Sequence, residues 1–380
     1  MGLNFPDTPT VGQIFPSPAI SGTGQWRWDG TEWLPNASPL LLGAPFDAMM
    51  HNNLVINGGM EVSQVNGTSS VTFATGTGQY MLDQWLLSFT NASAVFAGQQ
   101  ITPPGTPSFG ASFPSCLQFK ATTAISSLAA GDFAVFYQPF EGYRVNKLGY
   151  GAAGAQAITI AFWVYATIAG TFGVNIHNAA ANRSYVASVS INNATTWEYK
   201  TVVIPGDVTG TWPGGSALSF IIMLTFACGT TFTTTPGAWT AGNLFGVTGQ
   251  TNFFGTANNV VCLTGFGAWA GYQNPVSSLS QFYIRPFVEE NTLCERYYQI
   301  VAAAMDNQGT VTNDVSATQA SFRVLMRATP TCTGNAALST NIGASNFNVS
   351  GDGHGMTIQV TSSATGRFYW YGQILANARM

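Results

Sequence analysis

The sequence predicts an all-β protein: a jelly-roll-like β-sandwich followed by a short helix and a small C-terminal β domain. Short apolar or alternating runs, rich in β-branched and aromatic residues, recur from about residue 53 to 286 between Gly, Asn, Thr and Pro. Stretches of helix-forming residues are scarce, and long Thr, Gly and Asn connections favour a jelly roll over a meander. We therefore divide the chain into a short N-terminal segment (1–50), the sandwich (51–288), and a helix with a small β module (289–380).

The composition excludes several classes of protein. Charged residues make up 7% of the chain, against about 25% in typical soluble proteins. A hydrophobic content of 46% and a net charge of −4 argue against disorder. The lysines are only Lys120, Lys147 and Lys200, too few to neutralise a row of phosphates, so nucleic acid is not an expected partner. A chain with so few charged groups is expected to expose apolar patches, and we expect copies of it to associate and cover them.

The chain is expected to fold in a reducing cytosol, without a signal peptide and without membrane insertion. Its first residues lack a basic and an apolar region, and its most apolar run, 220–228, is about half as long as a spanning helix. That run is predicted to be a buried strand. Five widely spaced cysteines show no metal-ligand spacing and are expected to be reduced core thiols: Cys116, Cys228, Cys262, Cys294 and Cys332.

The N-terminal segment is rich in proline and carries a compact tryptophan cluster, Trp26, Trp28 and Trp33. The stretch 28–31 (WDGT) predicts a hairpin turn, with Asp29 and Gly30 at positive φ and tryptophans on both flanking strands. Because some fifty residues bury little core, the segment is expected to dock on the next domain or on a partner.

The sandwich strands are predicted from their apolar runs. The run 161–165 (AFWVY) is nearly continuous in apolar residues, which is typical of a strand buried on both faces. The predicted strands are 54–56, 115–121, 133–137, 158–165, 171–177, 196–204, 219–227, 259–267 and 281–285.

One helix is predicted at 289–298, where carboxylates lie at the N-terminal end and Leu293 and Tyr297 are four residues apart. The C-terminal strands are expected at 320–327, 347–349, 356–361 and 368–374. The stretch 367–372 (RFYWYG) is too aromatic to be exposed by chance.

Catalysis is not expected. The histidines, His51, His177 and His354, lie in three separate regions, where we expect surface or linker positions, without a nucleophile elbow or a zinc-ligand spacing. A glycosidase needs two carboxylates at one cleft, and the spacing of those in the sandwich does not pair any two. They are Asp83, which we expect to brace a strand end beside Trp85, and Glu141, Glu198 and Asp207.

No metal or other cofactor is expected either. The stretch 352–355 (DGHG) contains two ligand types, but a tight glycine-rich turn between two strands explains it better.

Sugar binding is the favoured chemistry. Apolar sugar faces stack on flat aromatic rings while sugar hydroxyls pair with Asn, Gln, Thr and Asp, and both groups are abundant between residues 212 and 272. Trp212 and Trp239 lie in turn-like sequence beside Pro-Gly and are the better candidates. The full set of candidates is Trp212, Trp239, Phe253, Phe254, Trp269 and Tyr272.

Several stretches, in this order, resemble virion proteins of tailed bacteriophages of the tail-fibre and adhesin kind. They are 5–13 with 26–33, 54–61 (LVINGGME) with 80–85 (YMLDQW), 285–298 with its LCERYY ending, and 322–331 (FRVLMRATPT). The chain departs from that family in lacking heptads, collagen-like repeats and any internal repeat, so a short fibre, spike or surface decoration fits better than a long shaft.

The resemblance implies a homotrimeric virion structural protein, assembled in the cytoplasm of the host bacterium, which binds host surface polysaccharide. Trp26, Trp28 and Trp33 would then face other virion proteins, since rigid aromatic residues are typical of interfaces. Two alternatives remain: a head-decoration protein without receptor binding, and a depolymerase that degrades capsule.

Overall fold

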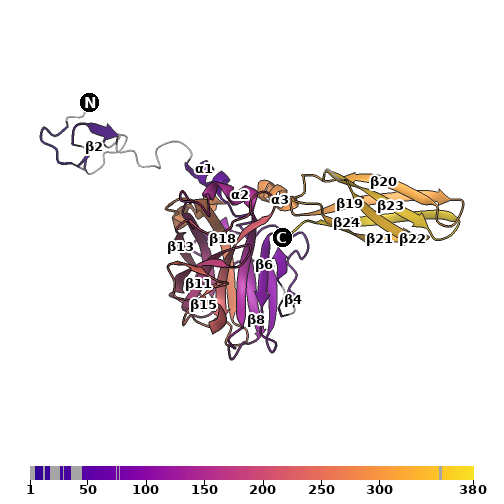
Figure 1. Ribbon diagram of the computed structural model, residues 1–380, viewed down its shortest axis with the longest axis horizontal. Helices are drawn as coiled ribbons and strands as arrows, with labels where there is room; N and C mark the ends of the chain where they lie inside the picture. Colours follow the sequence, from indigo (N-terminus) through magenta and orange to yellow (C-terminus); the bar gives the residue numbers. More distant parts are fainter. Residues whose placement is uncertain are drawn as a thin grey trace. The chain divides into compact units, whose positions relative to one another are not determined.

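The computed structural model divides into two compact units, Met1–Asn52 and Asn53–Met380, which are described separately. It describes residues 5–11, 13–17, 26–28, 30–35, 45–73, 75–76, 78–350 and 353–380 (Figure 1).

The N-terminal unit contains a small antiparallel sheet and one helix. Strand β2 (Trp26–Trp28) pairs with β1 (Ile14–Phe15) and with β3 (Trp33–Pro35), and α1 covers Pro45–Asn52. The predicted hairpin is confirmed because Trp28 lies opposite Trp33, with ring centroids 5.6 Å apart; Asp29 of the predicted turn lies outside the described residues. Phe5 packs on Trp26 and Trp33, at 5.4 and 5.1 Å, so an aromatic cluster holds this unit together.

The second unit begins with a β-sandwich of two antiparallel sheets. The six-stranded sheet has the order β13-β10-β18-β8-β7-β4 and the seven-stranded sheet the order β16-β12-β11-β14-β9-β6-β5. Their strands are β4 (Val71–Phe73), β5 (Gln79–Leu82), β6 (Trp85–Phe89), β7 (Val95–Ile101), β8 (Cys116–Thr123), β9 (Phe133–Glu141), β10 (Ile158–Ala166), β11 (Gly170–Asn178), β12 (Arg183–Ile191), β13 (Glu198–Ile204), β14 (Leu218–Cys228), β16 (Trp239–Ala241) and β18 (Val260–Ala270).

Short elements join these strands. A two-stranded parallel pair consists of β15 (Thr233–Thr234) and β17 (Gly246–Val247), and α2 covers Gly142–Val145. The 3-10 turns are η2 (Gly110–Ser112), η3 (Asn146–Leu148), η4 (Thr230–Phe232) and η5 (Ser277–Tyr283).

The sandwich core is largely aromatic. Phe162 of β10 stacks on Phe266 of the same sheet at 5.0 Å and meets Phe172 of the opposite sheet at 6.3 Å, so this contact joins the two layers. The predictions for 161–165 and 220–228 are confirmed, since β10 and β14 are buried along nearly their whole length. Trp163, on the other face of β10, is covered by Phe109 and Trp197.

Two predicted strands are wrong. Residues 54–56 are buried but belong to neither sheet. The Leu54 N–H donates to the Ala268 carbonyl of β18 at 2.8 Å, but Gln138 takes the place of a neighbouring strand at Ile56, where it exchanges two hydrogen bonds with the backbone at 3.0 and 2.8 Å. The predicted strand 281–285 is instead largely the 3-10 turn η5, which ends at Tyr283.

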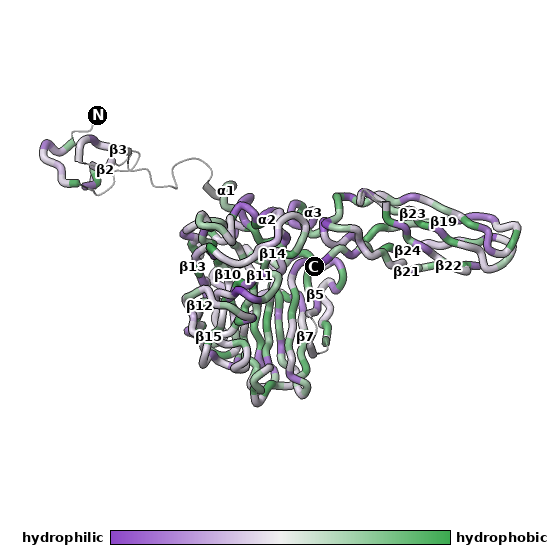
Figure 2. The backbone as a smooth tube through the Cα atoms, viewed as in Figure 1, coloured by the Kyte–Doolittle hydropathy of each residue, from purple (hydrophilic) through white to green (hydrophobic). Residues whose placement is uncertain are grey.

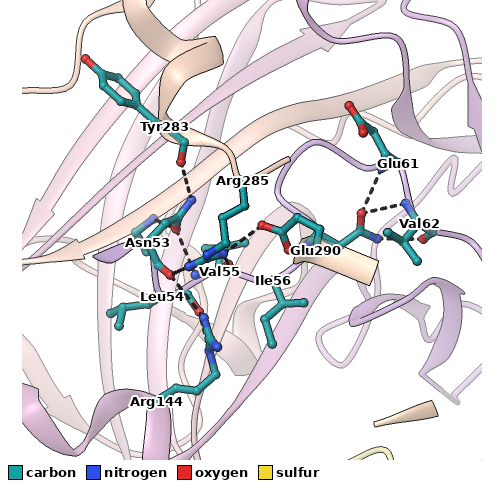
Figure 3. Close-up of polar contacts among 12 residues, drawn as sticks. Asn53, Leu54, Val55, Ile56, Glu61, Val62, Arg144, Tyr283, Arg285 and Glu290 are labelled. Atoms are coloured by element: carbon teal, nitrogen blue, oxygen red, sulfur yellow. Dashed lines mark hydrogen bonds and ion pairs between the residues drawn. The ribbon is translucent and has the colours of Figure 1, made fainter. Parts of the chain in front are cut away.

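Arg285 and Glu290 hold the segment 53–57 in place (Figure 3). Arg285 Nη1 donates to the Val55 carbonyl at 3.0 Å and to Glu290 Oε1 at 2.9 Å, and its Nη2 donates to the Asn53 carbonyl. Glu290 Oε2 accepts the Asn57 N–H at 2.6 Å. A buried ion pair therefore satisfies backbone groups that no strand reaches.

The predicted helix is present as α3 (Phe287–Glu295), slightly earlier in the chain than expected. Cys294 and Tyr297 pack on Ile56 and Val62, with Leu293 at the edge of the same cluster. The helix therefore closes the sandwich against the 53–62 segment.

The C-terminal module is a sandwich of two three-stranded sheets, β19-β24-β21 and β20-β23-β22. Buried and more exposed residues alternate along β23 and over most of β24, and the buried hydrophobic ones form a separate core. Figure 2 shows hydrophobic and hydrophilic positions intermixed along the module. The strands are β19 (Tyr298–Gly309), β20 (Val315–Ser321), β21 (Thr331–Thr340), β22 (Ile342–Val349), β23 (Gly355–Ser362) and β24 (Gly366–Asn377).

The predicted strand 320–327 is wrong beyond Ser321, where β20 ends. Gln299 binds the following backbone at the Arg323 N–H and the Val324 carbonyl, both at 2.9 Å, and Arg327 donates to the Ser216 carbonyl of the first sandwich at 2.6 Å. These side-chain bonds replace strand pairing. β19 and β21 were not foreseen, because small and polar residues make up most of both strands.

The five cysteines are free thiols, and all are buried except Cys332, which is half-buried. In the described ranges, no helix is both long enough and apolar enough to cross a bilayer.

Candidate functional site

Two of the predicted aromatic residues meet on the sandwich. Trp212 lies in the connection between β13 and β14, and Trp239 opens β16, the edge strand, where it pairs with Tyr185 of β12. Their ring centroids are 5.6 Å apart at an interplanar angle of 82°. Both side chains are half-buried, so part of each ring faces solvent.

Two tyrosines complete the group, which we call the Trp212 cluster: Tyr150, Tyr185, Trp212 and Trp239. The Tyr150 ring lies 4.9 Å from that of Trp212 and 5.8 Å from that of Trp239, and Tyr185 lies 5.5 Å from Trp239. Burial raises the pKa of Tyr150 well above its ordinary value, so this phenol stays protonated. Its hydroxyl is buried and makes no hydrogen bond to the described residues.

A small cavity of about 50 Å³ adjoins the cluster. Its lining includes Asn146, Tyr150, Trp212, Ser219 and Phe220. Aromatic rings and short polar side chains thus share one surface recess.

Hydrogen bonds fix both indoles. Trp212 Nε1 donates to the Thr209 carbonyl at 2.9 Å, and Trp239 Nε1 donates to the Pro205 carbonyl at 2.8 Å. Since the polar edge of each ring is satisfied within the protein, the exposed part is apolar and held in one orientation.

An ion pair borders the cluster. Arg183 binds Asp207 through two hydrogen bonds, Nε to Oδ2 at 2.7 Å and Nη2 to Oδ1 at 2.6 Å, and its guanidinium lies 5.8 Å from the Trp239 ring. Burial raises the pKa of Asp207, but hydrogen bonds from Arg183 and Thr209 outweigh this and leave the pKa below its ordinary value. The pair is therefore charged but carries no net charge.

Glycine allows the close approach on which the recess depends. Gly151 has φ +87°, and a Cβ there would come within 2.9 Å of the Gly210 carbonyl oxygen and 3.2 Å of Trp212 Cδ1. A larger residue at this position would push Trp212 away from Tyr150.

Three of the predicted candidates are wrong. Phe253 and Phe254 are 1% and 0% exposed within the main core, where Phe253 packs on Phe172 and Phe226. Trp269 is 2% exposed and packs on Tyr283. Because all three side chains are buried, they cannot contact a ligand at the surface. Aromatic content alone does not distinguish core residues from surface residues.

Tyr272 is 79% exposed just after β18, outside the ring contacts of the Trp212 cluster, and stays a prediction. Tyr150, Tyr185 and Arg183 were not foreseen. Tyr150 lies in a Gly-rich turn, a signal that could have identified it, while Tyr185 and Arg183 carry no local signal.

The carboxylates considered for catalysis are each tied to a basic side chain. Glu141 binds Arg296 at 2.9 Å, Glu198 binds Lys200, and Asp207 binds Arg183. Asp83 accepts the Gln64 N–H at 2.8 Å and lies 3.4 Å from Arg379 Nη2. Asp83 therefore braces the turn before Trp85, as expected.

The expectation for His177 is wrong. It is buried in β11, because the loop that ends in Leu244 covers this face of the sheet, and its Nδ1 lies 2.8 Å from Asn175 Oδ1. His51 and His354 are exposed, as expected.

The stretch 352–355 belongs to a tight connection between β22 and β23, with Gly353 at φ +71°; Asp352 lies outside the described residues. Among the described side chains, no three of His, Cys, Asp and Glu are grouped as a metal site would require.

The fold and this surface define a β-sandwich protein with a half-exposed aromatic recess. Structural similarity extends to the enzymatically active domain of tailspike protein 4 of bacteriophage CBA120 (10% identity, 58% of this chain and 22% of that one, TM-score 0.27). A family 11 carbohydrate-binding module from Clostridium thermocellum, in complex with a mixed-linked tetrasaccharide, is similar at 10% identity (54% of this chain, 98% of that one, TM-score 0.24).

Discoidin II of Dictyostelium discoideum is similar at 7% identity (70% of this chain, 82% of that one, TM-score 0.18). The chain covers less than a quarter of the length of the tailspike domain, 22%. No protein family and no curated protein matches the sequence.

Proposed function

We propose that the first sandwich binds carbohydrate at the Trp212 cluster and that the chain is a virion structural protein which engages host surface glycans. One observation carries the binding proposal: Trp212 and Trp239, which are distant in sequence, meet at 5.6 Å with their indole N–H groups satisfied and their rings half-exposed. Rigid aromatic surface of this kind suits the apolar face of a sugar ring.

The polar groups around the cluster support the same ligand class. The Arg183 side chain is 22% exposed beside Trp239, and Asn146 and Ser219 line the recess. Because the ion pair has no net charge, the recess favours hydroxyl-rich ligands over anions.

A printed array of bacterial surface polysaccharides, probed with the purified protein, tests the binding proposal. Trp212→Ala and Trp239→Ala should each weaken binding of a bound polysaccharide roughly tenfold, the scale of one lost stacking contact. Phe282→Ala, which removes an exposed ring elsewhere on the sandwich, should leave binding unchanged. Equal affinities for all four proteins would remove the proposal.

We assign attachment to the virion to the N-terminal unit. Residues Met1–Asn52 form a compact unit of their own, and the cluster of Phe5, Trp26, Trp28 and Trp33 within it supports a small module that docks on a partner. Deleting residues 1–45 should leave a folded protein that no longer joins particles, and particles that still incorporate it would refute this assignment. Native mass spectrometry tests the proposed homotrimer.

The proposal is of binding without catalysis. A reducing-sugar assay on host envelope, in which this protein should release nothing, separates it from a depolymerase. A head-decoration protein would instead bind capsid and show no affinity for host cells.

A further inference from the structure

The solvent face of the β19-β24-β21 sheet carries a second group of aromatic and charged side chains. Along β24, Phe368 and Trp370 point into the module core, while Tyr369 and Tyr371 lie on the opposite face and are half-exposed. The Tyr369 and Tyr371 ring centroids are 5.4 Å apart, at an interplanar angle of 52°. The aromatic run 367–372 thus serves the core on one side and forms a surface on the other.

Asp306 of β19 joins this row from the neighbouring strand, opposite Tyr369. Its Oδ1 accepts a hydrogen bond from Arg367 Nε at 2.9 Å, and its Oδ2 accepts one from the Tyr371 hydroxyl at 2.9 Å and one from Arg367 Nη2 at 2.5 Å. The guanidinium of Arg367 lies 5.2 Å from the Tyr369 ring. Four side chains on two strands are therefore held in one arrangement before any ligand binds.

A small neighbour on β19 leaves the Tyr371 ring open on that side. Tyr371 lies between Ala304 of β19 and Leu338 of β21, both exposed, and Gln373 continues the row along β24. Side chains as short as alanine cannot cover an adjacent tyrosine ring, so solvent reaches it from this side.

Stability does not account for the ion pair. The side chains of Arg367 and Asp306 are 63% and 35% exposed, and solvent screens such pairs so that they contribute little to folding. In a chain with only 7% charged residues, a bidentate pair placed between two tyrosines points to recognition. The hydrogen bonds from Arg367 and Tyr371 hold the pKa of Asp306 at about 2, so its carboxylate remains an acceptor at any physiological pH.

We propose that this face is a second carbohydrate-binding site, in which Tyr371 and Tyr369 stack against sugar rings while Asp306 and Arg367 bind neighbouring hydroxyls. Asp306 and Arg367 cancel each other's charge, so the site takes an uncharged glycan. Because the two rings are inclined by 52°, one flat sugar face cannot cover both, and the ligand is a chain of at least two sugar residues.

A second copy of this chain is the competing occupant of the face. Cores of protein interfaces are depleted in charged residues, and burying this ion pair between two copies would remove both groups from water. Arg367 lies over the Tyr369 ring and Asp306 accepts from the Tyr371 hydroxyl, so a second copy that covered the rings would also bury the pair. The face therefore favours a solvated ligand.

The test uses the full chain carrying Trp212→Ala and Trp239→Ala, so that the first proposed site does not contribute. On a printed array of neutral and uronic-acid-containing polysaccharides, this protein should keep affinity for neutral members. Adding Tyr371→Ala should weaken that binding roughly tenfold, and adding Asp306→Asn should also weaken it. Val315→Ala, an exposed change on the other sheet of the module, is the matched control and should have no effect.

Three results would overturn the proposal. They are no binding by the Trp212/Trp239 double variant, binding that is indifferent to both Tyr371→Ala and Asp306→Asn, and binding confined to anionic polysaccharides. Light scattering on the same variants checks the competing occupant: a change of oligomeric state with unchanged glycan binding would assign the face to a second copy. Circular dichroism of Asp306→Asn, which leaves both rings in place, guards against a loss of fold.

Discussion

Replacing Glu290 by alanine removes the acidic partner of the buried Arg285–Glu290 ion pair, which binds the backbone of the segment 53–57. The carboxylate of Glu290 binds Arg285 at 2.9 Å and the Asn57 N–H at 2.6 Å, and both side chains of the pair are almost fully buried. The change therefore leaves a buried guanidinium without its counter-charge and a backbone N–H without an acceptor. Arg285 keeps its bonds to the Asn53 and Val55 carbonyls, which limits the loss.

Breaking a buried pair from one side costs about 3–5 kcal/mol, and we expect Glu290→Ala to lower the free energy of unfolding by about 3 kcal/mol. Urea unfolding followed by tryptophan fluorescence measures it, with Trp85 as a local reporter, since its Nε1 donates to the Asn57 carbonyl at 3.0 Å. The double variant Arg285→Met and Glu290→Leu leaves no unpaired charge, but it also leaves the Val55 carbonyl and the Asn57 N–H without their partners, so it should recover only part of the loss.

Arg367→Gln breaks an exposed pair and is the matched control, with an unfolding free energy close to that of the unaltered protein. If Glu290→Ala unfolded at the same urea concentration as this control, the reasoning from burial would be refuted.

Three further predictions concern the sandwich. Burial lowers the pKa of His177 to about 4, while an unfolded histidine titrates near about 6.5; the unfolded state alone takes up a proton between these values, so stability falls as the pH drops through this window. In His177→Gln, the fall in the free energy of unfolding across this window, measured by urea unfolding at several pH values, should be smaller by on the order of 2 kcal/mol. An unchanged slope would contradict the assignment. A Cβ on Gly142 would lie 2.4 Å from Gly214 Cα, so Gly142→Ala should displace the loop that carries Trp212 and weaken polysaccharide binding several-fold; Gly154→Ala, where a Cβ meets nothing, should bind normally. Glu141→Ala frees Arg296 from its two hydrogen bonds, at 2.9 and 3.2 Å, and should lower the unfolding free energy by about 2 kcal/mol, with earlier proteolytic cleavage after α3; a cleavage rate equal to that of the unaltered protein would count against it.

Strand prediction worked where burial is simple. The continuous apolar runs of β10 and β14 have one favourable environment, between two layers, so residue type alone predicts their burial. It failed at 281–285, which is largely the 3-10 turn η5, and at 54–56, where the side chains of Gln138 and Arg285 bind backbone groups in place of a neighbouring strand. Those side chains come from distant parts of the chain, so a local pattern does not contain them.

The candidate site was likewise predictable only in part from local sequence. Turn residues beside Trp212 and Trp239 predicted that these rings lie near the surface, and both are half-exposed. The neighbouring candidates Phe253 and Trp269 have the same composition around them but belong to the core. An aromatic ring in a Thr- and Asn-rich stretch reaches solvent or core according to which way its backbone turns, and the sequence signal is equal for both.

The sequence by itself determined the class of fold, the hairpin of the N-terminal unit and the turn positions of two tryptophans, because strand propensity, alternation and turn chemistry act between residues close in the chain. Only the tertiary structure decided that Trp212 meets Trp239, Tyr150 and Tyr185, that Arg285 meets the 53–57 backbone, and that Tyr371 faces outward beside Asp306. The physical reason is that sheet order and register bring together residues that are far apart in sequence, and these long-range pairings depend on the packing of the whole sandwich.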